Sequence, residues 1–138
     1  MPTWLFLVIL FQLKHFIADY PLQGRYMLRK FSSGWAWVLP LATHAAVHAS
    51  MTFLLVFMFV GWHAGVFLAV FDFVIHFTMD RIKASPNMLG RFKALTGETA
   101  STATATQWRS NDHFWWALGF DQMVHHLTHY AIIWWILR

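Results

Sequence analysis

Four long apolar stretches follow one another along the chain, and each is close to the length that a membrane helix needs. They run over about residues 2–20, 35–60, 65–82 and 112–137. A helix crosses the hydrocarbon core of a bilayer with roughly 20 predominantly apolar residues. The pattern therefore predicts an all-α, polytopic membrane protein with four transmembrane helices packed as a bundle. A chain of 138 residues is long enough for a single domain only.

The segments between the predicted helices carry turn and loop signals. Gly61-Trp62-His63-Ala64-Gly65 predicts a short turn that makes the second and third helices an antiparallel hairpin. Residues 84–110 hold Pro86, several glycines and an alternating Thr/Ala run, which predicts a polar cytoplasmic loop. The role of the Thr/Ala-rich residues 97–107 stays open. The first stretch has no basic start and no small-residue cleavage site, so we expect a mature helix and not a signal peptide.

The composition supports a lipid environment. Apolar residues make up 58% of the chain and charged residues 12%, whereas a soluble domain carries about 25% charged residues. Nine tryptophans and fourteen phenylalanines suit membrane helices and bilayer interfaces. The chain has no cysteine, which excludes a disulfide framework.

Basic residues gather in two predicted loops that fall on the same side of a four-helix bundle. The first loop and the third loop together carry Arg25, Arg29, Lys30, Arg81, Lys83, Arg91, Lys93 and Arg109. Because cytoplasmic loops collect lysine and arginine, we expect both loops in the cytoplasm and both termini outside, an N-out, C-out topology. This placement also accounts for the net charge of +4 without a nucleic-acid partner.

Aspartate and histidine recur at a spacing of four residues in every predicted helix. In chain order the sets are His15/Asp19, His44/His48, Asp72/His76/Asp80 and Asp121/His125/His129. Residues four apart lie about 40° apart around a helix, so each set forms a polar stripe on one face. An uncompensated aspartate costs on the order of 3 kcal/mol at the bilayer centre, so we expect the stripes to face one another. With a rise of about 1.5 Å per residue, most would lie roughly 8 to 20 Å below the cytoplasmic face.

The residue types in these stripes are those of a metal site, since zinc is commonly bound by imidazole nitrogen and carboxylate oxygen. The candidate ligands of one or two divalent metal ions, with zinc favoured, are His15, Asp19, His44, His48, His76, Asp121 and His125. Asp80 and Asp72 are the candidate catalytic groups, either as general base or as partners that orient a ligand histidine. Gln23 and Gln122 are candidate polar contacts beside the metal.

Simpler roles stay open for the same residues. Buried histidine and aspartate can hold helices together by hydrogen bonds alone. Asp19 and Asp80, near the predicted interface, can pair with cations close to them in the sequence. These cations are Lys14, Arg25, Arg81 and Lys83. His126 points about 100° away from the stripe of its helix, and we expect it to contact a neighbouring helix or a lipid headgroup.

The segment His15-Phe-Ile-Ala-Asp19-Tyr20-Pro21-Leu22-Gln23 resembles the opening signature of an uncharacterised family of small bacterial and phage inner-membrane proteins, domain of unknown function 3307. The other His/Asp stripes, including Asp121-Gln122-x-x-His125, fall at that family's polar positions. The resemblance covers nearly the whole chain and implies a multi-helix membrane protein without an established activity. Scattered His and Asp on apolar helices are also similar to membrane-bound metal-dependent hydrolases, by pattern only. The threonine-rich loop has no counterpart in either resemblance.

We expect metal-dependent hydrolysis of a lipid or lipid-linked ester, because a bound metal can activate water and polarise a phosphoryl or acyl oxygen. Membrane lipids are the expected partners, and Arg25, Arg29 and Lys30 could attract an anionic headgroup.

Two other classes of function stay open. The first is an ion or proton transporter or channel component, which would require a homo-oligomer, and the second is a non-enzymatic interaction protein of a bacterial or phage membrane. An ion path should cross the whole bilayer, whereas Asp72 and His129 are the only deep polar candidates. The pattern therefore favours a site open to one side.

Overall fold

The computed structural model describes residues 1–32, 34–84, 104 and 112–138, which fold into helices, turns and short extended segments. The long helices are α1 (Thr3–Asp19), α2 (Val38–Val60), α3 (Trp62–Ala84) and α6 (Asp112–Leu137), and the short 3-10 helix η1 (Met27–Phe31) lies between α1 and α2. No strand occurs within these residues, which confirms the all-α class. The predicted loop over residues 84–110, with its Thr/Ala-rich part at 97–107, lies almost wholly outside the described residues.

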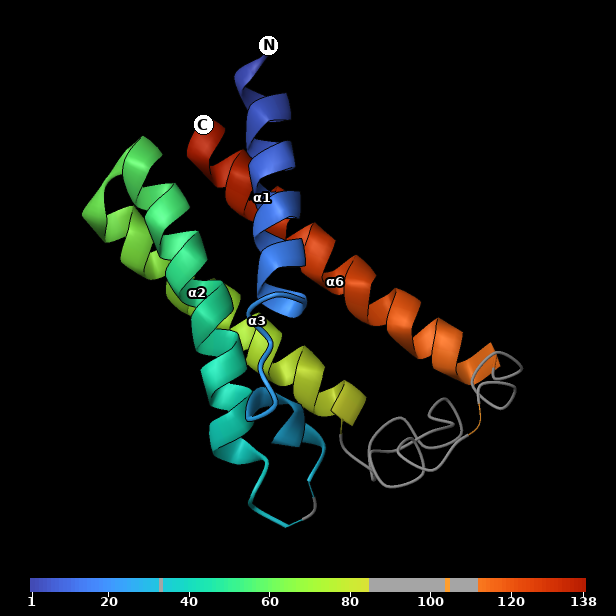
Figure 1. Ribbon diagram of the computed structural model, residues 1–138. Helices are drawn as coiled ribbons and strands as arrows, with labels where there is room; N and C mark the ends of the chain where they lie inside the picture. Colours follow the sequence, from blue (N-terminus) through green and yellow to red (C-terminus); the bar gives the residue numbers. More distant parts are fainter. Residues whose placement is uncertain (33, 85–103, 105–111) are drawn as a thin grey trace.

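The helices run alongside one another as a bundle (Figure 1). α2 and α3 form an antiparallel hairpin, and α1 and α6 pack against it. Both chain termini and the turn between α2 and α3 lie at one end, which we call the termini end. The other end holds η1, the last turn of α3 and the first turn of α6, and we call it the η1 end.

The turn between α2 and α3 is shorter than the sequence predicts. Gly61 ends α2 with a φ of 88°, a conformation that favours glycine, and its N–H donates to the Phe57 carbonyl at 3.1 Å. α3 begins at Trp62, and the N–H of Gly65 already donates to the Gly61 carbonyl at 3.0 Å. The predicted five-residue turn is therefore wrong, because a single glycine with positive φ reverses the chain.

Two other helix ends differ from the expected bounds. α2 begins at Val38 and not at Trp35, because η1 and several turns within residues 20–32 and 34–37 precede the helix. α3 continues to Ala84 and not to Ile82. This extension keeps Lys83 on a helical turn that faces the interior of the bundle.

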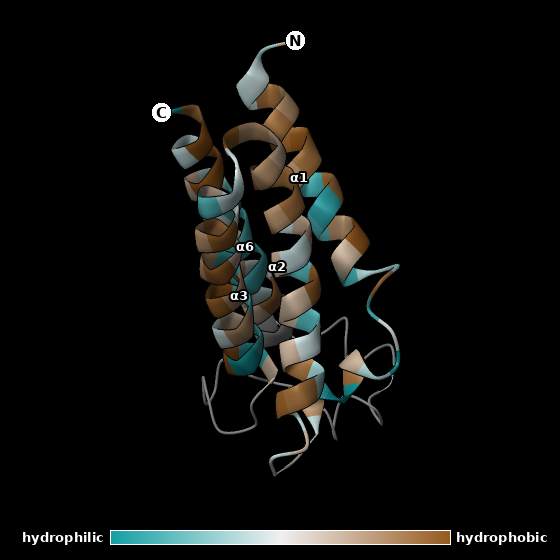
Figure 2. Ribbon diagram, turned by 90° about the vertical axis from the view of Figure 1, so that its left-hand side faces the viewer, coloured by the Kyte–Doolittle hydropathy of each residue, from teal (hydrophilic) through white to brown (hydrophobic). Residues whose placement is uncertain are grey.

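The interior of the bundle is polar and its surface is apolar. Buried polar side chains include Lys14, His15, Lys30, His44, His48, Asp72, His76, Asp80, Asp121, His125 and His129. Large apolar side chains are exposed on all four long helices, among them Trp4, Phe16, Leu54, Phe67, Trp116 and Trp134. Figure 2 shows hydrophilic positions set at intervals along otherwise hydrophobic helices. A water-soluble bundle has the opposite arrangement. By length and composition, α2 and α3 are each able to cross a membrane.

The interior becomes apolar toward the termini end. Leu7, Phe11, Val56, Leu68, Ile132 and Ile133 form one buried cluster there, which we call the apolar cap. The ring of Phe11 lies 5.3 Å from the ring of His129, so the cap meets the polar interior directly. The core therefore has two parts, an apolar one at the termini end and a polar one that extends from the middle toward η1.

We predict that Gly65→Leu destabilises the α2–α3 hairpin by about 1 to 3 kcal/mol, the usual cost of overpacking. A Cβ at Gly65 would lie 3.1 Å from Phe53 Cδ2, so a larger side chain has to push the helices apart. The midpoint of unfolding in detergent measures the effect. Gly119→Leu on α6 is the matched control, since a Cβ there meets nothing within 4 Å. Equal stability of the two variants would contradict the close approach at Gly65.

Candidate metal centre

Lys14 holds Asp72 at the deep end of the polar interior, next to the apolar cap. Lys14 Nζ donates to Asp72 Oδ2 at 2.7 Å, and Thr52 Oγ1 donates to the same oxygen at 2.6 Å. Lys14 Nζ also lies 3.4 Å from His129 Nε2. Both charged side chains are essentially inaccessible to solvent, so close geometry has to offset a desolvation penalty of several kcal/mol per ion. Lys14 therefore pairs with Asp72 and not with Asp19, the partner that the sequence suggests.

Two further lysines hold the aspartates nearer the η1 end. Lys30 Nζ donates to Asp80 Oδ2 at 2.6 Å. Lys83 Nζ lies 2.6 Å from Asp121 Oδ2 and 3.1 Å from Asp80 Oδ1. Lys30 is buried, so the expectation that it attracts a lipid headgroup is wrong. η1 folds back over the bundle and places this lysine against an interior carboxylate.

Asp19 is surrounded by histidines and not by lysine. Its Oδ2 lies 3.1 Å from His15 Nε2, and its Oδ1 lies 3.0 Å from His48 Nε2 and 3.4 Å from His44 Nε2. Within the described part of the chain, no lysine or arginine nitrogen lies within ion-pair distance of this carboxylate. Ligand atoms around a tetrahedral zinc with bonds of about 2.0 to 2.1 Å are roughly 3.3 Å apart. The separations of 3.0 and 3.4 Å from Asp19 Oδ1 to His48 Nε2 and His44 Nε2 are close to that value, and the 3.0 Å contact is also a hydrogen-bond distance.

Partial exposure also distinguishes Asp19. Its side chain is 21% exposed, whereas those of Asp72, Asp80 and Asp121 are at most 3% exposed. Gln23 Nε2 donates to the Asp19 carbonyl at 3.0 Å, just beyond the end of α1. Asp19 is thus the most accessible of these four carboxylates.

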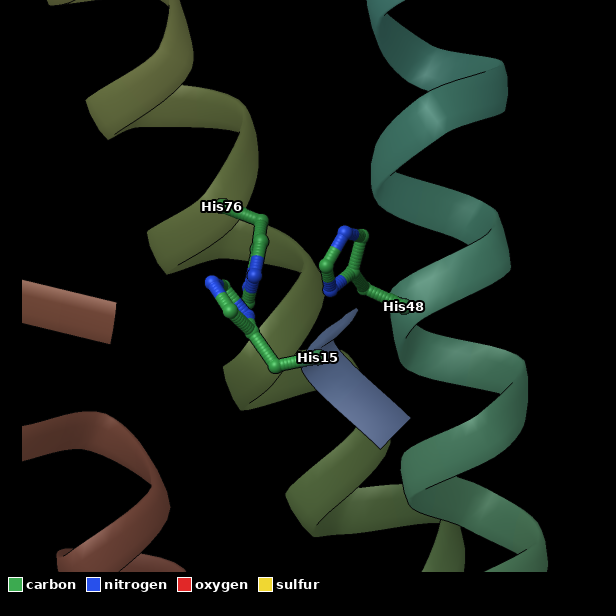
Figure 3. A group of neighbouring side chains, drawn as sticks. All are labelled: His15, His48 and His76. Carbon is green, nitrogen blue, oxygen red and sulfur yellow. The ribbon is translucent and has the colours of Figure 1, made fainter. Parts of the chain in front are cut away.

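Histidine rings connect Asp19 to the other stripes. The ring centroids of His48 and His76 are 3.9 Å apart, and those of His76 and His125 are 4.0 Å apart. His15, His48 and His76 point toward one another from three different helices (Figure 3). One ring nitrogen from each of these three residues lies within 4.8 Å of the others. Imidazoles from α1, α2 and α3 therefore meet at the centre of the bundle.

Among the residues that the structure describes, four groups of three have ligand atoms close enough together to hold a metal ion. They are His15/His48/His76, Asp19/His44/His48, Asp72/His76/His129 and Asp80/Asp121/His125, each with ligand atoms within 4.8 Å of one another. Lysine ammonium groups already contact the aspartates of the last two groups. A metal ion meets no ammonium competitor in direct contact with the carboxylate of the second group.

The seven predicted metal ligands all lie in this interior, but they are divided among overlapping groups of three. Of the predicted catalytic aspartates, Asp80 lies 3.1 Å from His44 Nε2, whereas Asp72 is held by Lys14 and Thr52. Gln122 Oε1 lies 3.2 Å from His15 Nε2, and the contacts of Gln23 are described above. His126 is half-buried, with its ring 5.6 Å from that of His15, so it borders the cluster.

The polar interior holds more polar atoms than its own hydrogen bonds satisfy. Buried atoms without a hydrogen-bond partner among the described residues include Asp72 Oδ1, Asp121 Oδ1, His76 Nε2 and the Nδ1 atoms of His15, His44, His48, His125 and His129. An unsatisfied buried polar group costs about 1 to 3 kcal/mol, and native proteins usually satisfy such groups with water or ions. The interior is therefore chemically suited to hold additional ligands.

The contacts of Lys14 with Asp72, of Lys30 with Asp80 and of Thr52 with Asp72 were missed, whereas Lys83 pairs with Asp80, as one alternative from the sequence suggested. Periodicity could have indicated Lys14, because it shares the buried face of α1 with Leu7, Phe11 and Ala18. Thr52 follows His48 at the same spacing of four residues. Lys30 carried no such signal, since its burial depends on how η1 packs.

Comparison with known proteins gives one match. A family model described as "Protein of unknown function (DUF3307)" matches residues 6–137. No curated protein and no solved structure matches the chain.

We predict that Lys14→Met lowers the free energy of unfolding by about 3 to 5 kcal/mol, the usual loss when one partner of a buried ion pair is removed. The cause is the Asp72 carboxylate, which would keep its charge without a cation. Lys14→Met combined with Asp72→Asn should recover most of the loss, since the amide oxygen still accepts from Thr52. Unfolding in detergent, followed by circular dichroism, measures both variants. A single variant as stable as the wild type would show that the pair is not formed.

Proposed function

The chain belongs to the DUF3307 family of proteins of unknown function, and from the geometry of its polar interior we propose that it is a membrane-embedded metalloprotein with hydrolytic activity. The proposed metal is a single divalent ion, with zinc favoured, bound by Asp19, His44 and His48 and completed by His15. The proposed substrate is a lipid or a lipid-linked ester that approaches from the η1 end. The proposed location is the bacterial inner membrane.

The inverted distribution of polar and apolar residues supports a four-span arrangement. Exposed leucine, phenylalanine, valine and tryptophan side chains on all four long helices would be costly in water and are ordinary in lipid. The shortest of these helices, α1, has 17 residues, and a rise of 1.5 Å per residue gives it a length of about 26 Å. This length is at the lower limit for crossing a hydrocarbon core of roughly 30 Å.

The observation that carries the metal proposal is the charge balance around Asp19. Among the described residues, four buried or half-buried aspartates face three interior lysines, and these lysines contact Asp72, Asp80 and Asp121 but not Asp19. Asp19 has three imidazole nitrogens within 3.4 Å and no ammonium in contact among the described residues. A divalent cation would supply the missing positive charge, and neutral imidazole together with carboxylate is the donor set that zinc prefers.

The hydrolytic proposal follows from where this centre lies. A zinc ion near the exposed edge of Asp19 can lower the pKa of a bound water and polarise an ester oxygen. Asp80 contacts the proposed ligand His44 at 3.1 Å, so we assign Asp80 a positioning role for that imidazole. Asp72 is inaccessible and tied to Lys14 and Thr52, so we assign it to the stability of the bundle. The exposed Arg25 and Arg29 near η1 remain candidates for binding an anionic headgroup.

The apolar cap weighs against the transport alternative. A conducting path needs polar groups through the full thickness of the membrane. Leu7, Phe11, Val56, Leu68 and Ile132 are at most 3% exposed and fill the bundle at the termini end. This packing supports a site that is reached from the η1 end, as we propose.

We predict that detergent-purified wild type binds about one zinc ion per chain, and that Asp19→Asn and His44→Ala each weaken zinc binding by more than tenfold. Metal content and zinc titration measure binding. Release of product from phospholipid and lipid-linked phosphate esters in mixed micelles measures hydrolysis, which a chelator should abolish.

His63→Ala is the matched control, because His63 is an exposed histidine of α3 and should leave zinc binding unchanged. A folded wild type that stays metal-free when zinc is added would refute the metal proposal. Metal binding without hydrolysis of either substrate class would refute the enzymatic part alone.

We predict an N-out, C-out topology, because the η1 end carries Arg25, Arg29 and Arg81 while the termini end has Arg138 as its only lysine or arginine in the described chain. A periplasm-active reporter fused after Arg138 should be active, and a cytoplasm-active reporter at that position should be silent. The reverse pattern would place the proposed site on the other side of the membrane.

A further inference from the structure

Asp80, Asp121 and His125 form a second carboxylate and imidazole group, separate from the Asp19 carboxylate. Asp121 Oδ1 lies 3.3 Å from His125 Nε2, and Asp80 Oδ1 lies 4.0 Å from the same nitrogen. Their three ligand atoms are within 4.8 Å of one another. Two carboxylates and one imidazole from α3 and α6 are a common donor set for a divalent cation.

The ammonium group of Lys83 is the cation that contacts both carboxylates of this group. Lys83 Nζ lies 2.6 Å from Asp121 Oδ2 and 3.1 Å from Asp80 Oδ1, so it bridges the two carboxylates. With Lys83 in this position, one carboxylate oxygen of the group still makes no hydrogen bond among the described residues. Asp121 Oδ1 is buried and has no hydrogen-bond partner among the described residues, although it lies beside His125.

We propose that Asp80, Asp121 and His125 are a second divalent-cation site, and that the Lys83 ammonium occupies it as a tethered cation that a metal ion can displace. The inference adds a second position to the proposed metal function, but its geometry stands on different carboxylates. A protein with Lys83 in place holds one metal ion. The same protein with Lys83 displaced or removed holds two.

Of the three interior lysines, Lys83 is the one whose ammonium group can move into solvent most easily. It lies on the last turn of α3 at the η1 end, and its side chain is 24% exposed, whereas those of Lys14 and Lys30 are at most 5% exposed. A long flexible stem lets the ammonium move to water without disturbing the helix. Asp80 would keep Lys30 at 2.6 Å, so only Asp121 would lose its sole lysine.

His44 and Asp80 connect the two positions. His44 Nε2 lies 3.1 Å from Asp80 Oδ2 and 3.4 Å from Asp19 Oδ1, so a single imidazole borders both carboxylates. Paired metal sites that share bordering ligands can stabilise both the attacking and the leaving oxygen of a displacement at phosphorus. Displacement of Lys83 would thereby convert a single-metal centre into a two-metal centre suited to phosphate esters.

The test is the zinc stoichiometry of the full-length chain in detergent after equilibrium dialysis against zinc. Lys83→Met keeps the length of the side chain and removes the charge, and it should bind one more zinc ion per chain than the wild type. His125→Ala in the Lys83→Met background should abolish the additional ion. Zinc should also raise the melting temperature of Lys83→Met more than that of the wild type, because only the variant gains a second bound ion.

Two control experiments test whether the additional ion binds at Asp80, Asp121 and His125. Arg81→Met removes a cation two residues away that stacks on Trp37 at 3.7 Å, and it should leave the stoichiometry unchanged. Asp19→Asn removes the first proposed site, so Lys83→Met in that background should still gain one ion over its parent. That gain would support the second site even if the wild type bound no metal. A folded Lys83→Met, or Lys83→Gln if the methionine variant does not fold, with wild-type stoichiometry would overturn the inference and leave the first site standing.

Discussion

A carboxylate that leaves water needs a cation or several hydrogen-bond donors, and this requirement organises the whole bundle. Three lysine–aspartate pairs join different elements: Lys14 of α1 to Asp72 of α3, Lys30 of η1 to Asp80 of α3, and Lys83 of α3 to Asp121 of α6. In the proposed membrane setting the hydrophobic effect would give helices little reason to associate, so polar contacts of this kind would determine which faces meet. The ion pairs therefore have the architectural role that an apolar core has in a soluble protein.

α3 is the helix on which these contacts converge. It carries Asp72, His76, Asp80 and Lys83 at spacings of three and four residues, so all four lie along one inward face. α1 contributes Asp19 as its last residue, and α6 contributes Asp121 from within the helix. Among the described residues, Asp72, Asp80 and Asp121 each contact a lysine, whereas Asp19 contacts imidazoles. This difference distinguishes three structural ion pairs from the Asp19 group, which we propose as the metal site.

Much of the fold was predictable, because hydropathy and the spacing of four residues are local properties of each helix. They indicated the four helices and the inward stripes. Lys30 was not predictable in the same way, since topology rules assign a basic residue between two helices to a loop. Lys30 lies in the interior only because the chain between α1 and α2 forms η1 and turns back, and a tertiary arrangement of that kind leaves no periodic signal in the sequence. The single-glycine turn at Gly61 was also hidden, because Trp62, His63 and Gly65 look like turn residues in isolation but continue the helix.

The apolar cap has an electrical consequence for a bundle that lies in a bilayer. A voltage across a membrane falls mainly over the part with the lowest polarisability, and here that part is the layer of Leu7, Phe11, Val56 and Ile132. Moving one elementary charge through the full potential is worth about 2.3 kcal/mol per 100 mV. In the proposed membrane arrangement, charges that enter the polar interior from the η1 end would stop short of that layer and cross only a small fraction of the potential. Ion occupancy at Asp19 would thus be nearly independent of whether the cell membrane is energised.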